Sequence, residues 1–308
     1  MNKNSCILCG SQHISKIDHI PKNLLNKAYV KEYGIDVLDD IKEDMHLIHC
    51  HVCDIKFFDP CQTGGQSFYT SLQKFEWYYK SDKYEYEYVS SKLIKTNDSV
   101  LEIGCGTGTF SNRIRSSNYV GLEFSENAVR LGRWYGRNIK QQSIEDHAKE
   151  NENQYDVVCS FQVLEHTSDP KSFIESCIKV LKPGGTLIIT TPSEDSWIQY
   201  KQDFCLNMPP HHVTKWTDKC LINISKLFGV KHVDIHHEPL DFFHISWYFN
   251  SLFVFQLNSL LKIKHSLLKR KRHWIPHFIA NALSKVFGRT LPDAFKPHGH
   301  TVISVYKK

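Results

Sequence analysis

Three glycines at alternate positions, directly after an apolar segment, most strongly restrict the fold of this 308-residue chain. The segment 99–110 reads SVLEIGCGTGTF, with the glycines at Gly104, Gly106 and Gly108. Glycine weakens helices and strands alike, but it lets the backbone bend sharply and approach a ligand without interference from a Cβ atom. The segment therefore predicts a strand, a glycine loop and the start of a helix, in that order.

Short apolar segments alternate with amphipathic segments from residue 97 onward. We predict strands at 99–104, 118–124, 155–161 and 185–192, and helices at 109–116, 125–136, 170–181 and 217–228. Strands that alternate with helices are typical of a parallel sheet covered on both faces. Ligands of such sheets bind beyond the carboxyl ends of the strands, which is where the glycine loop is predicted to lie.

Two acidic residues accompany the glycines. A dinucleotide site would have the spacing G-x-G-x-x-G, whereas here the spacing is E-x-G-x-G-x-G, with Glu102 inside the predicted strand. A carboxylate there would repel a pyrophosphate but could bind an ammonium group. Glu123 ends the next predicted strand, where an acidic residue accepts hydrogen bonds from ribose hydroxyls. The segment 142–146, QSIED, is expected to contact an adenine edge.

Together these motifs resemble the class I S-adenosylmethionine-dependent methyltransferases over roughly residues 66–240. The segment 155–166, YDVVCSFQVLEH, resembles the fourth motif of that family, and 180–192, VLKPGGTLIITTP, resembles the approach to its fifth strand. The resemblance implies an α/β, Rossmann-like sheet of seven strands and S-adenosylmethionine as cofactor. It implies cofactor contacts from Glu102, Gly104, Cys105, Gly106, Gly108, Glu123, Phe124, Ser143, Ile144, Glu145, Phe161 and Gln162.

Paired histidines follow paired prolines in the segment 207–217, NMPPHHVTKWT. Methyl transfer to a hydroxyl or a carbon acid needs a base, and histidine suits that role near neutral pH. The segment resembles the catalytic loop of methyltransferases that act on nucleotide-activated sugars, which implies His212 as the base and His211 in place of a glutamate. Glu165 and His166 either contribute to the same site or cap the loop that follows them.

Two Cys-x2-Cys pairs, Cys6 with Cys9 and Cys50 with Cys53, lie in the first sixty residues. Four thiolates from two tight turns can complete a tetrahedral zinc shell, which leaves no open position for catalysis. His46, His49 and His51 could replace one cysteine, and Cys61 is a weaker substitute. We predict a small zinc ribbon-like domain at 1–65, stabilised by a structural Zn²⁺, and a methyltransferase domain at 66–308.

The last two predicted strands, 231–240 and 300–308, are separated by an insertion at about 242–296, predicted to be helical. Residues 242–292 contain no Asp or Glu, and an apolar first half precedes a basic second half. The insertion is either a helical cap or oligomer interface, or a basic amphipathic element on an anionic membrane surface or lipid-linked substrate. The net charge of +5 by itself indicates no particular partner. The start of the chain, the paired cysteines and the lack of long apolar runs predict a cytoplasmic protein, with peripheral contact to the inner membrane surface as the variant.

The leading hypothesis is methylation of a hydroxyl on a sugar or nucleotide-sugar in surface glycan biosynthesis. Alternatives are C-methylation of a keto-sugar nucleotide, and O-methylation of a lipid-linked or quinone-type acceptor at the membrane surface. A non-enzymatic alternative is a zinc-ribbon binding protein with a degenerate methyltransferase core. Base methylation of nucleic acid is discounted, because 160–163 reads SFQV and lacks the Asn/Asp-Pro-Pro-aromatic run that grips an exocyclic amine.

Overall fold

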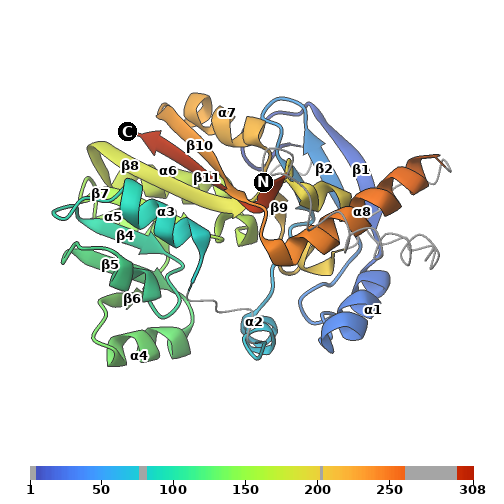
Figure 1. The fold of residues 1–308 in the computed structure, drawn as a ribbon, viewed down its shortest axis with the longest axis horizontal. Coiled ribbons are helices and arrows are strands. Elements are labelled where there is room, and N and C mark those ends of the chain that lie inside the picture. Colours follow the sequence, from blue (N-terminus) through green and yellow to red (C-terminus); the bar gives the residue numbers. More distant parts are fainter. Residues whose placement is uncertain (1–4, 76–81, 202–203, 261–296) are drawn as a thin grey trace.

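A seven-stranded sheet forms the centre of the protein in the computed structural model, which describes residues 5–75, 82–201, 204–260 and 297–308 (Figure 1). The strand order is β6 (Ile139–Gln141), β5 (Tyr119–Glu123), β4 (Val100–Ile103), β7 (Tyr155–Phe161), β8 (Leu181–Pro192), β11 (His298–Lys307) and β10 (Lys231–Pro239). β11 is antiparallel to both of its neighbours, and the pairs from β6 to β8 are parallel. The predicted seven-stranded α/β fold is confirmed.

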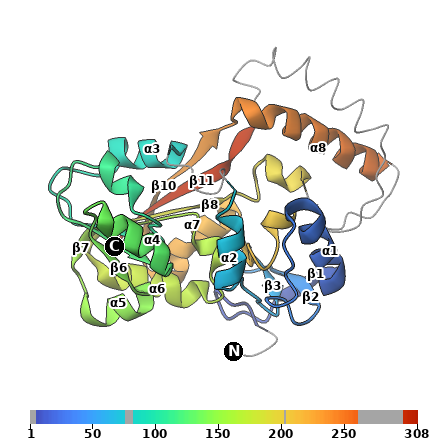
Figure 2. The same ribbon diagram turned by 90° about the horizontal axis from the view of Figure 1, so that it is seen from below.

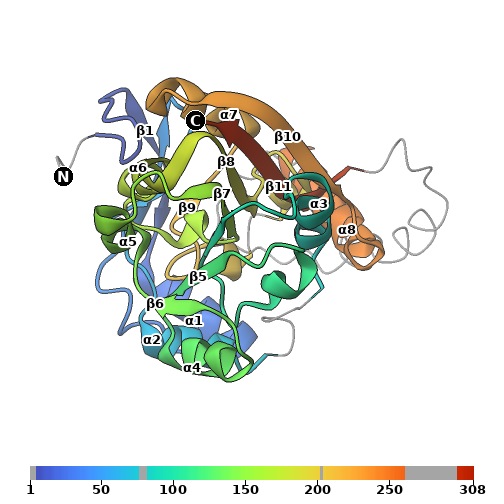
Figure 3. The same ribbon diagram turned by 90° about the vertical axis from the view of Figure 1, so that its left-hand side faces the viewer.

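Alternate residues of the central strands bury their side chains on opposite faces of this sheet, as expected for strands covered on both sides. Val158, Leu187 and Ile189 pack with α5 (Ile144–Glu150), α6 (Pro170–Val180) and α7 (Asp218–Phe228). The intervening Val157 and Ile188 pack with α3 (Tyr84–Lys92) on the other face. Figure 3 shows α5 and α6 on one side of the sheet and α3 on the other.

Helix starts follow local capping chemistry. The side chains of Ser125, Asp169 and Thr217 each accept a hydrogen bond from a backbone N–H of the first turn of α4 (Glu126–Trp134), α6 and α7. The helices predicted at 125–136, 170–181 and 217–228 are thus confirmed to within two residues at each end. The helix predicted at 109–116 is wrong, because only a 3-10 turn, η1 (Thr109–Arg113), forms before Ile114 returns to extended backbone.

A second, antiparallel sheet has the order β1 (Ile14–Ile20), β2 (Met45–Cys50), β3 (Lys56–Asp59) and β9 (Thr214–Lys215). Helix α1 (Lys22–Tyr33) connects β1 to the segment before β2. The last strand, β9, comes from the segment that follows the paired histidines. The division at residue 65 stays a prediction, since this sheet takes one strand from beyond it.

Helix α2 (Gln66–Leu72) lies between the two sheets in sequence, and its Phe68 and Leu72 are buried with Leu25 and Tyr29 of α1. After β10, helix α8 (Phe242–Leu260) begins where the helical insertion was predicted and extends away from the edge formed by β10 and β11 (Figure 2). The basic half of that insertion lies outside the described residues. None of the helices that the structure describes is both long and apolar enough to cross a membrane.

Candidate active site

The glycine loop begins at the carboxyl end of β4. Gly104, Gly106 and Gly108 have φ values of 66°, 56° and 76°, a left-handed conformation that favours glycine. A Cβ atom on Gly104 would lie 2.5 Å from Cγ2 of Val163, so this position requires glycine for space as well as for conformation. Between the first two glycines, the Cys105 N–H donates to the carbonyl oxygen of Leu122 on β5 at 3.0 Å.

Glu123 joins this loop to the end of the neighbouring strand. Its Oε2 accepts from the Gly106 N–H at 2.9 Å, and its Oε1 accepts from the N–H groups of Phe124 and Ser125 at 2.9 and 2.8 Å. A carboxylate has about four acceptor sites, so Glu123 can accept a further hydrogen bond from a ribose hydroxyl. Phe124 beside it is 73% exposed, which leaves an aromatic face available to a base.

Glu102 lies beneath the loop rather than at its surface. Its carboxylate is buried and accepts a hydrogen bond from the Tyr119 hydroxyl. Burial raises the pKa of Glu102 to about 8, although the Tyr119 hydrogen bond opposes this shift. The sequence contained no signal for the contact with Tyr119. Binding of an ammonium group by Glu102 stays a prediction.

The remaining predicted cofactor residues lie at the carboxyl ends of neighbouring strands. Ser143 accepts a hydrogen bond from the Asp146 N–H at 2.9 Å and so caps α5, which starts with Ile144 and Glu145. Phe161 is buried against Tyr86 and Phe110. Gln162 has φ 58°, a conformation that is uncommon for a residue other than glycine and is concentrated at functional sites. The cofactor contacts of these residues stay predictions.

Three histidines converge beside this strand edge, although the sequence placed them in two separate segments. His166 lies in the 3-10 turn η2 (Leu164–His166) after β7, and His211 and His212 follow the 3-10 turn η4 (Cys205–Asn207). One ring nitrogen of each histidine lies within 4.8 Å of the others. The ring centroids are 4.4 to 4.9 Å apart. We call these three residues the histidine cluster.

Each ring of the histidine cluster uses its Nδ1 atom in a hydrogen bond to a carbonyl oxygen. The partners are the His211 carbonyl for His166 at 2.6 Å, the Leu206 carbonyl for His211 at 2.9 Å, and Asn207 Oδ1 for His212 at 3.1 Å. Burial lowers the pKa of His166 to about 4 and holds the pKa values of His211 and His212 well below the usual range. The three rings are therefore neutral near pH 7.

Glu165 is buried beside the histidine cluster. Its Oε2 accepts from the Thr191 hydroxyl at 3.2 Å, and its Oε1 lies 3.8 Å from His166 Nε2. Burial raises the pKa of this carboxyl group to about 8. The Glu165 carbonyl also accepts from the Val213 N–H at 2.8 Å, which ties η2 to the chain directly after the paired histidines.

The N-terminal strands and helix α1 contact residues 205–213, which we call the histidine loop, on the side away from η2. The Tyr29 hydroxyl of α1 donates to the carbonyl oxygens of Cys205 at 2.7 Å and Met208 at 3.0 Å. The Gly64 N–H donates to the Pro210 carbonyl at 2.9 Å. On β3, the Phe58 N–H donates to the carbonyl of Val213 at 3.0 Å. Residues 205–213 are thus held between the N-terminal part of the chain and η2.

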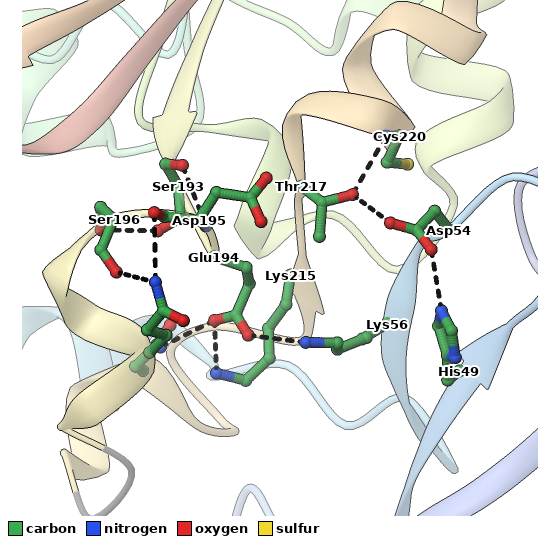
Figure 4. Close-up of polar contacts among 12 residues, drawn as sticks. His49, Asp54, Lys56, Ser193, Glu194, Asp195, Ser196, Lys215, Thr217 and Cys220 are labelled. Atoms are coloured by element: carbon green, nitrogen blue, oxygen red, sulfur yellow. Dashed lines mark hydrogen bonds and ion pairs between the residues drawn. The ribbon is translucent and has the colours of Figure 1, made fainter. Parts of the chain in front are cut away.

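A buried carboxylate, Glu194, orients the loop through Asn207. The Nδ2 of Asn207 donates to Glu194 Oε1 at 3.3 Å, so its Oδ1 faces His212. Lys215 and Lys56 contact the same carboxylate at 3.0 and 3.3 Å (Figure 4). Burial alone would raise the pKa of Glu194, but the two ammonium groups outweigh it and hold that pKa at about 2. The sequence reasoning missed Asn207, because no motif marks an amide five residues before the histidine that it orients.

The four predicted zinc ligands also come together. Cys6 Sγ lies 3.5 Å from Cys53 Sγ, Cys9 Sγ lies 3.6 Å from Cys50 Sγ, and all four sulfur atoms are within 4.8 Å of one another. Each pair ends in a left-handed residue, Gly10 with φ 73° and Asp54 with φ 72°. Their N–H groups donate to the carbonyls of Cys6 at 3.0 Å and of Cys50 at 2.9 Å.

These matching turns fit a tetrahedral zinc ion, whose thiolate ligands must approach one another closely. The N–H of Leu8 also donates to Cys6 Sγ at 3.4 Å, as expected of a group that supports a metal-bound thiolate. Among the residues that the structure describes, this four-sulfur group includes none of the alternative ligands considered from the sequence, which were His46, His49, His51 and Cys61.

Comparisons with known proteins agree with this geometry. A family model described as a methyltransferase domain matches residues 78–234. A ubiquinone biosynthesis O-methyltransferase from Erwinia tasmaniensis is 30% identical over 165 residues, which cover 46% of this chain and 66% of that protein. One from Hydrogenovibrio crunogenus is 32% identical over 103 residues, 31% of this chain and 43% of that protein. The chain therefore spans less than two thirds of the length of these relatives.

Among solved structures, a SAM-dependent methyltransferase from Archaeoglobus fulgidus is 20% identical and has a TM-score of 0.42. The alignment covers 68% of this chain and 85% of that one. The family match carries more weight, because it includes the glycine loop, Glu123 and both segments of the histidine cluster within 78–234, half of the chain. By that match, the protein belongs to the family of methyltransferase domains.

Proposed function

We propose that the protein transfers a methyl group from S-adenosylmethionine to a hydroxyl group of a small acceptor. The observation that carries this proposal is the arrangement of the loop of Gly104, Gly106 and Gly108, joined to Glu123, beside the histidine cluster at one edge of the sheet. The first group of residues provides a donor site and the second a proton-accepting acceptor site. β4 leads into the glycine loop and β7 leads into η2 with His166, and these two strands are paired in parallel.

The donor side fits S-adenosylmethionine through groups of this chain. Glu123 retains acceptor capacity for ribose hydroxyls, Phe124 exposes an aromatic face to adenine, and Gly106 and Gly108 leave the loop backbone bare. The cofactor supplies a methyl group bound to a sulfonium sulfur. In the transfer, the acceptor oxygen forms a bond to the methyl carbon as the carbon–sulfur bond breaks, and the electron pair of that bond stays on sulfur.

On the acceptor side, we propose His212 as the group that takes the hydroxyl proton. Its Nδ1 faces the amide oxygen of Asn207, which can only accept, so the ring proton sits on Nδ1 and Nε2 holds a lone pair. His166 and His211 border the same space. Positioning of the acceptor oxygen in line with the methyl carbon and sulfur supplies much of the remaining rate enhancement.

The acceptor class is proposed from two separate comparisons. The resemblance of the histidine loop to the catalytic loop of methyltransferases that act on nucleotide-activated sugars favours a sugar or nucleotide-sugar of glycan biosynthesis. The curated relatives are described as ubiquinone biosynthesis O-methyltransferases, which favours a phenolic hydroxyl on a quinone-type acceptor. Both acceptors are hydroxyl groups, so the proposed chemistry is the same for each.

A substrate panel tests the function and separates the acceptor classes. The purified protein is incubated with isotopically labelled methyl donor and with nucleotide-sugars, glycans, keto-sugar nucleotides and hydroxylated quinone precursors, and products are identified by mass spectrometry. A gain of one methyl group on oxygen supports the proposal. Methylation of carbon, with exchange of the proton next to the ketone, contradicts it. Absence of binding to S-adenosylhomocysteine in calorimetry contradicts the donor site itself.

For the four cysteines we propose a structural Zn²⁺. The two matching turns hold four sulfur atoms in one group, and a shell of four thiolates leaves no position for a substrate. The ion would join residues 6–9 to the hairpin of β2 and β3, and β3 contacts the histidine loop. Its proposed role is therefore to support the acceptor site from a distance.

A further inference from the structure

The histidine cluster and Glu165 form a group of metal-ligand type that is separate from the four cysteines. His166 comes from one segment, and His211 and His212 come from another, yet one ring nitrogen of each lies within 4.8 Å of the others. Ordinary Zn–N distances place tetrahedral nitrogen ligands about 3.3 Å apart. The three nitrogens therefore need to approach one another by at most about 1.5 Å to share an ion.

In all three rings, the hydrogen bonds at Nδ1 place the lone pair on Nε2. Each Nδ1 lies at 2.6 to 3.1 Å from a carbonyl oxygen. A carbonyl oxygen only accepts, so each Nδ1 carries the ring proton and each Nε2 carries the lone pair. Histidine ligands of metal ions use this arrangement, in which a carbonyl oxygen orients the ring through its other nitrogen.

The orientation of His212 is further supported through Asn207. Asn207 donates its amide N–H to Glu194, and Lys215 and Lys56 anchor that carboxylate (Figure 4). The amide oxygen therefore has to face His212. A chain of four polar groups thus determines which nitrogen of one ring can bind an ion.

Glu165 is a second and independent observation that points to a cation. Within the part of the chain that the structure describes, its Oε1 atom is buried and makes no hydrogen bond. The same atom lies 3.8 Å from His166 Nε2. A buried carboxylate oxygen without a hydrogen-bond donor is costly, and a divalent ion between it and the three imidazoles would remove that cost.

We propose that His166, His211 and His212 bind a divalent transition-metal ion through Nε2, with Glu165 as a fourth ligand or as its charge partner. Three imidazoles and one carboxylate favour Zn²⁺ or a similar first-row ion over Mg²⁺, which prefers oxygen ligands. With three imidazole ligands and Glu165 as charge partner, such a site keeps a fourth coordination position for a substrate, whereas the four-thiolate site does not.

For catalysis this inference rests on the proposed function and changes one part of it. An acceptor hydroxyl bound to the ion would have a lowered pKa and would release its proton to solvent at neutral pH. His212 then acts as a metal ligand and not as the proton acceptor, because Nε2 cannot do both. The bonds made and broken in the methyl transfer are otherwise the same.

Metal stoichiometry tests the site without reference to activity. The full chain is dialysed against Zn²⁺, and bound metal is measured by mass spectrometry. We expect two equivalents for the wild type and one for His166→Ala and for His211→Ala. The matched control His19→Ala, an exposed histidine paired with Asp44, retains two. Equal stoichiometry in all four proteins overturns the proposal. Binding of S-adenosylhomocysteine and far-ultraviolet circular dichroism establish that the variants are folded.

A cobalt titration needs no variant. Wild-type protein that already contains one equivalent of Zn²⁺ is titrated with Co²⁺, and its visible absorption is recorded. Saturable ligand-field bands without sulfur-to-cobalt charge transfer support a second site of nitrogen and oxygen ligands. Bands that carry thiolate charge transfer, or absence of saturable bands, overturn it.

The two proposals can fail separately. If protein with one equivalent of zinc methylates a hydroxyl acceptor at a rate that a second equivalent of zinc does not change, that result contradicts the metal proposal and leaves the proposed function intact. Two bound equivalents without methyl transfer to any acceptor sink the function and leave the metal site intact.

Discussion

At the scale of single residues, the proposed acceptor site depends on which ring nitrogen of His212 carries the lone pair. His212 contributes Nε2 because Asn207 occupies Nδ1, and Asn207 is oriented because Glu194 accepts from its amide N–H. Neither Asn207 nor Glu194 belongs to a motif, yet both determine what the histidine can do. Side chains that act through another residue therefore belong to the proposed site.

Replacement of His212 by alanine removes the Nε2 lone pair on which the proposed acceptor site depends, as a base or as a metal ligand. We expect the catalytic rate to fall by roughly two to four orders of magnitude, as with loss of a general base. The affinity for S-adenosylhomocysteine, measured by calorimetry, should stay unchanged, because the donor residues lie on other segments. His19→Ala is the control and should keep full activity. Weakened donor binding with intact turnover would contradict the assignment.

The buried carboxylate of Glu194 predicts a pH-dependent stability. Its pKa is about 2 in the folded protein against an ordinary value of 4.5, so the carboxylate stabilises the fold above about pH 4.5. This stabilisation is lost as the pH falls toward 2. Glu194→Gln leaves Lys215 and Lys56 without their partner, and should lower the free energy of unfolding by about 3 kcal/mol near pH 7.

Urea unfolding of both proteins between pH 2 and pH 7 measures this difference. The difference in free energy of unfolding between wild type and Glu194→Gln should decrease steadily below about pH 4.5. Asp146→Asn is the control, because Asp146 forms an exposed ion pair with Lys149 that contributes little. A difference in unfolding free energy that stays constant from pH 2 to pH 7 would show that the carboxylate charge does not contribute to stability.

At the scale of elements, the glycine loop follows β4 in the chain and is hydrogen-bonded to the carboxyl end of β5. Its three left-handed glycines give the backbone its shape, and Glu123 of β5 accepts from the Gly106 N–H. The loop is thus shaped by two strands and not by its own sequence alone. The 3-10 turn that follows it is too short to act as a helix N-terminus, so the donor site depends on the loop and on Glu123.

Gly104→Ala tests the space available to this loop. The added Cβ would meet Val163 at 2.5 Å in a left-handed backbone, and displacement of the loop should weaken binding of S-adenosylhomocysteine about tenfold or more. Gly136→Ala is a matched control, because Gly136 has a similar φ of 77° with no atom within 4 Å of its added Cβ. Equal affinities in calorimetry would show that the loop does not contact the donor.

At the scale of the whole molecule, the histidine loop is hydrogen-bonded both to the N-terminal sheet and to η2, which follows β7 of the central sheet. β9 extends the N-terminal sheet directly after the loop, and Tyr29 of α1 holds two of its carbonyl groups. Cys6, Cys50 and Cys53 are buried in the same hydrophobic cluster as Trp216 and residues of α7. The four-cysteine region therefore packs against the segment that directly follows the histidine loop.

Tyr29→Phe should loosen the histidine loop from this side. Loss of the hydroxyl proton that the Cys205 and Met208 carbonyls share is expected to lower the free energy of unfolding by about 1–3 kcal/mol. Amide hydrogen exchange should accelerate at residues 205–213, and kcat should fall while donor affinity stays constant. Tyr135→Phe, an exposed tyrosine beyond α4, is the control. Unchanged exchange at 205–213 would contradict a supporting role for α1.

Local patterns in the sequence determined the fold class, the glycine loop and the two Cys-x2-Cys turns. Alternating apolar segments predict strands and helices because these signals depend on neighbours within a few residues. The same reasoning failed at 109–116, where the chain leaves the helical conformation at Ile114. It placed Glu102 inside one strand and Glu123 at the end of the next, as the structure has them, but the contact of Glu102 with Tyr119 lay beyond it.

Only the tertiary structure decided which residues meet across long separations. His166 and His212 are 46 positions apart, and Tyr29 contacts a carbonyl 179 positions away. Such contacts arise from the packing of whole elements, and no spacing within a short segment encodes them. The sequence alone therefore specified the glycine loop, whereas the histidine cluster, its buried carboxylate and its support by the N-terminal sheet exist only once the chain has folded.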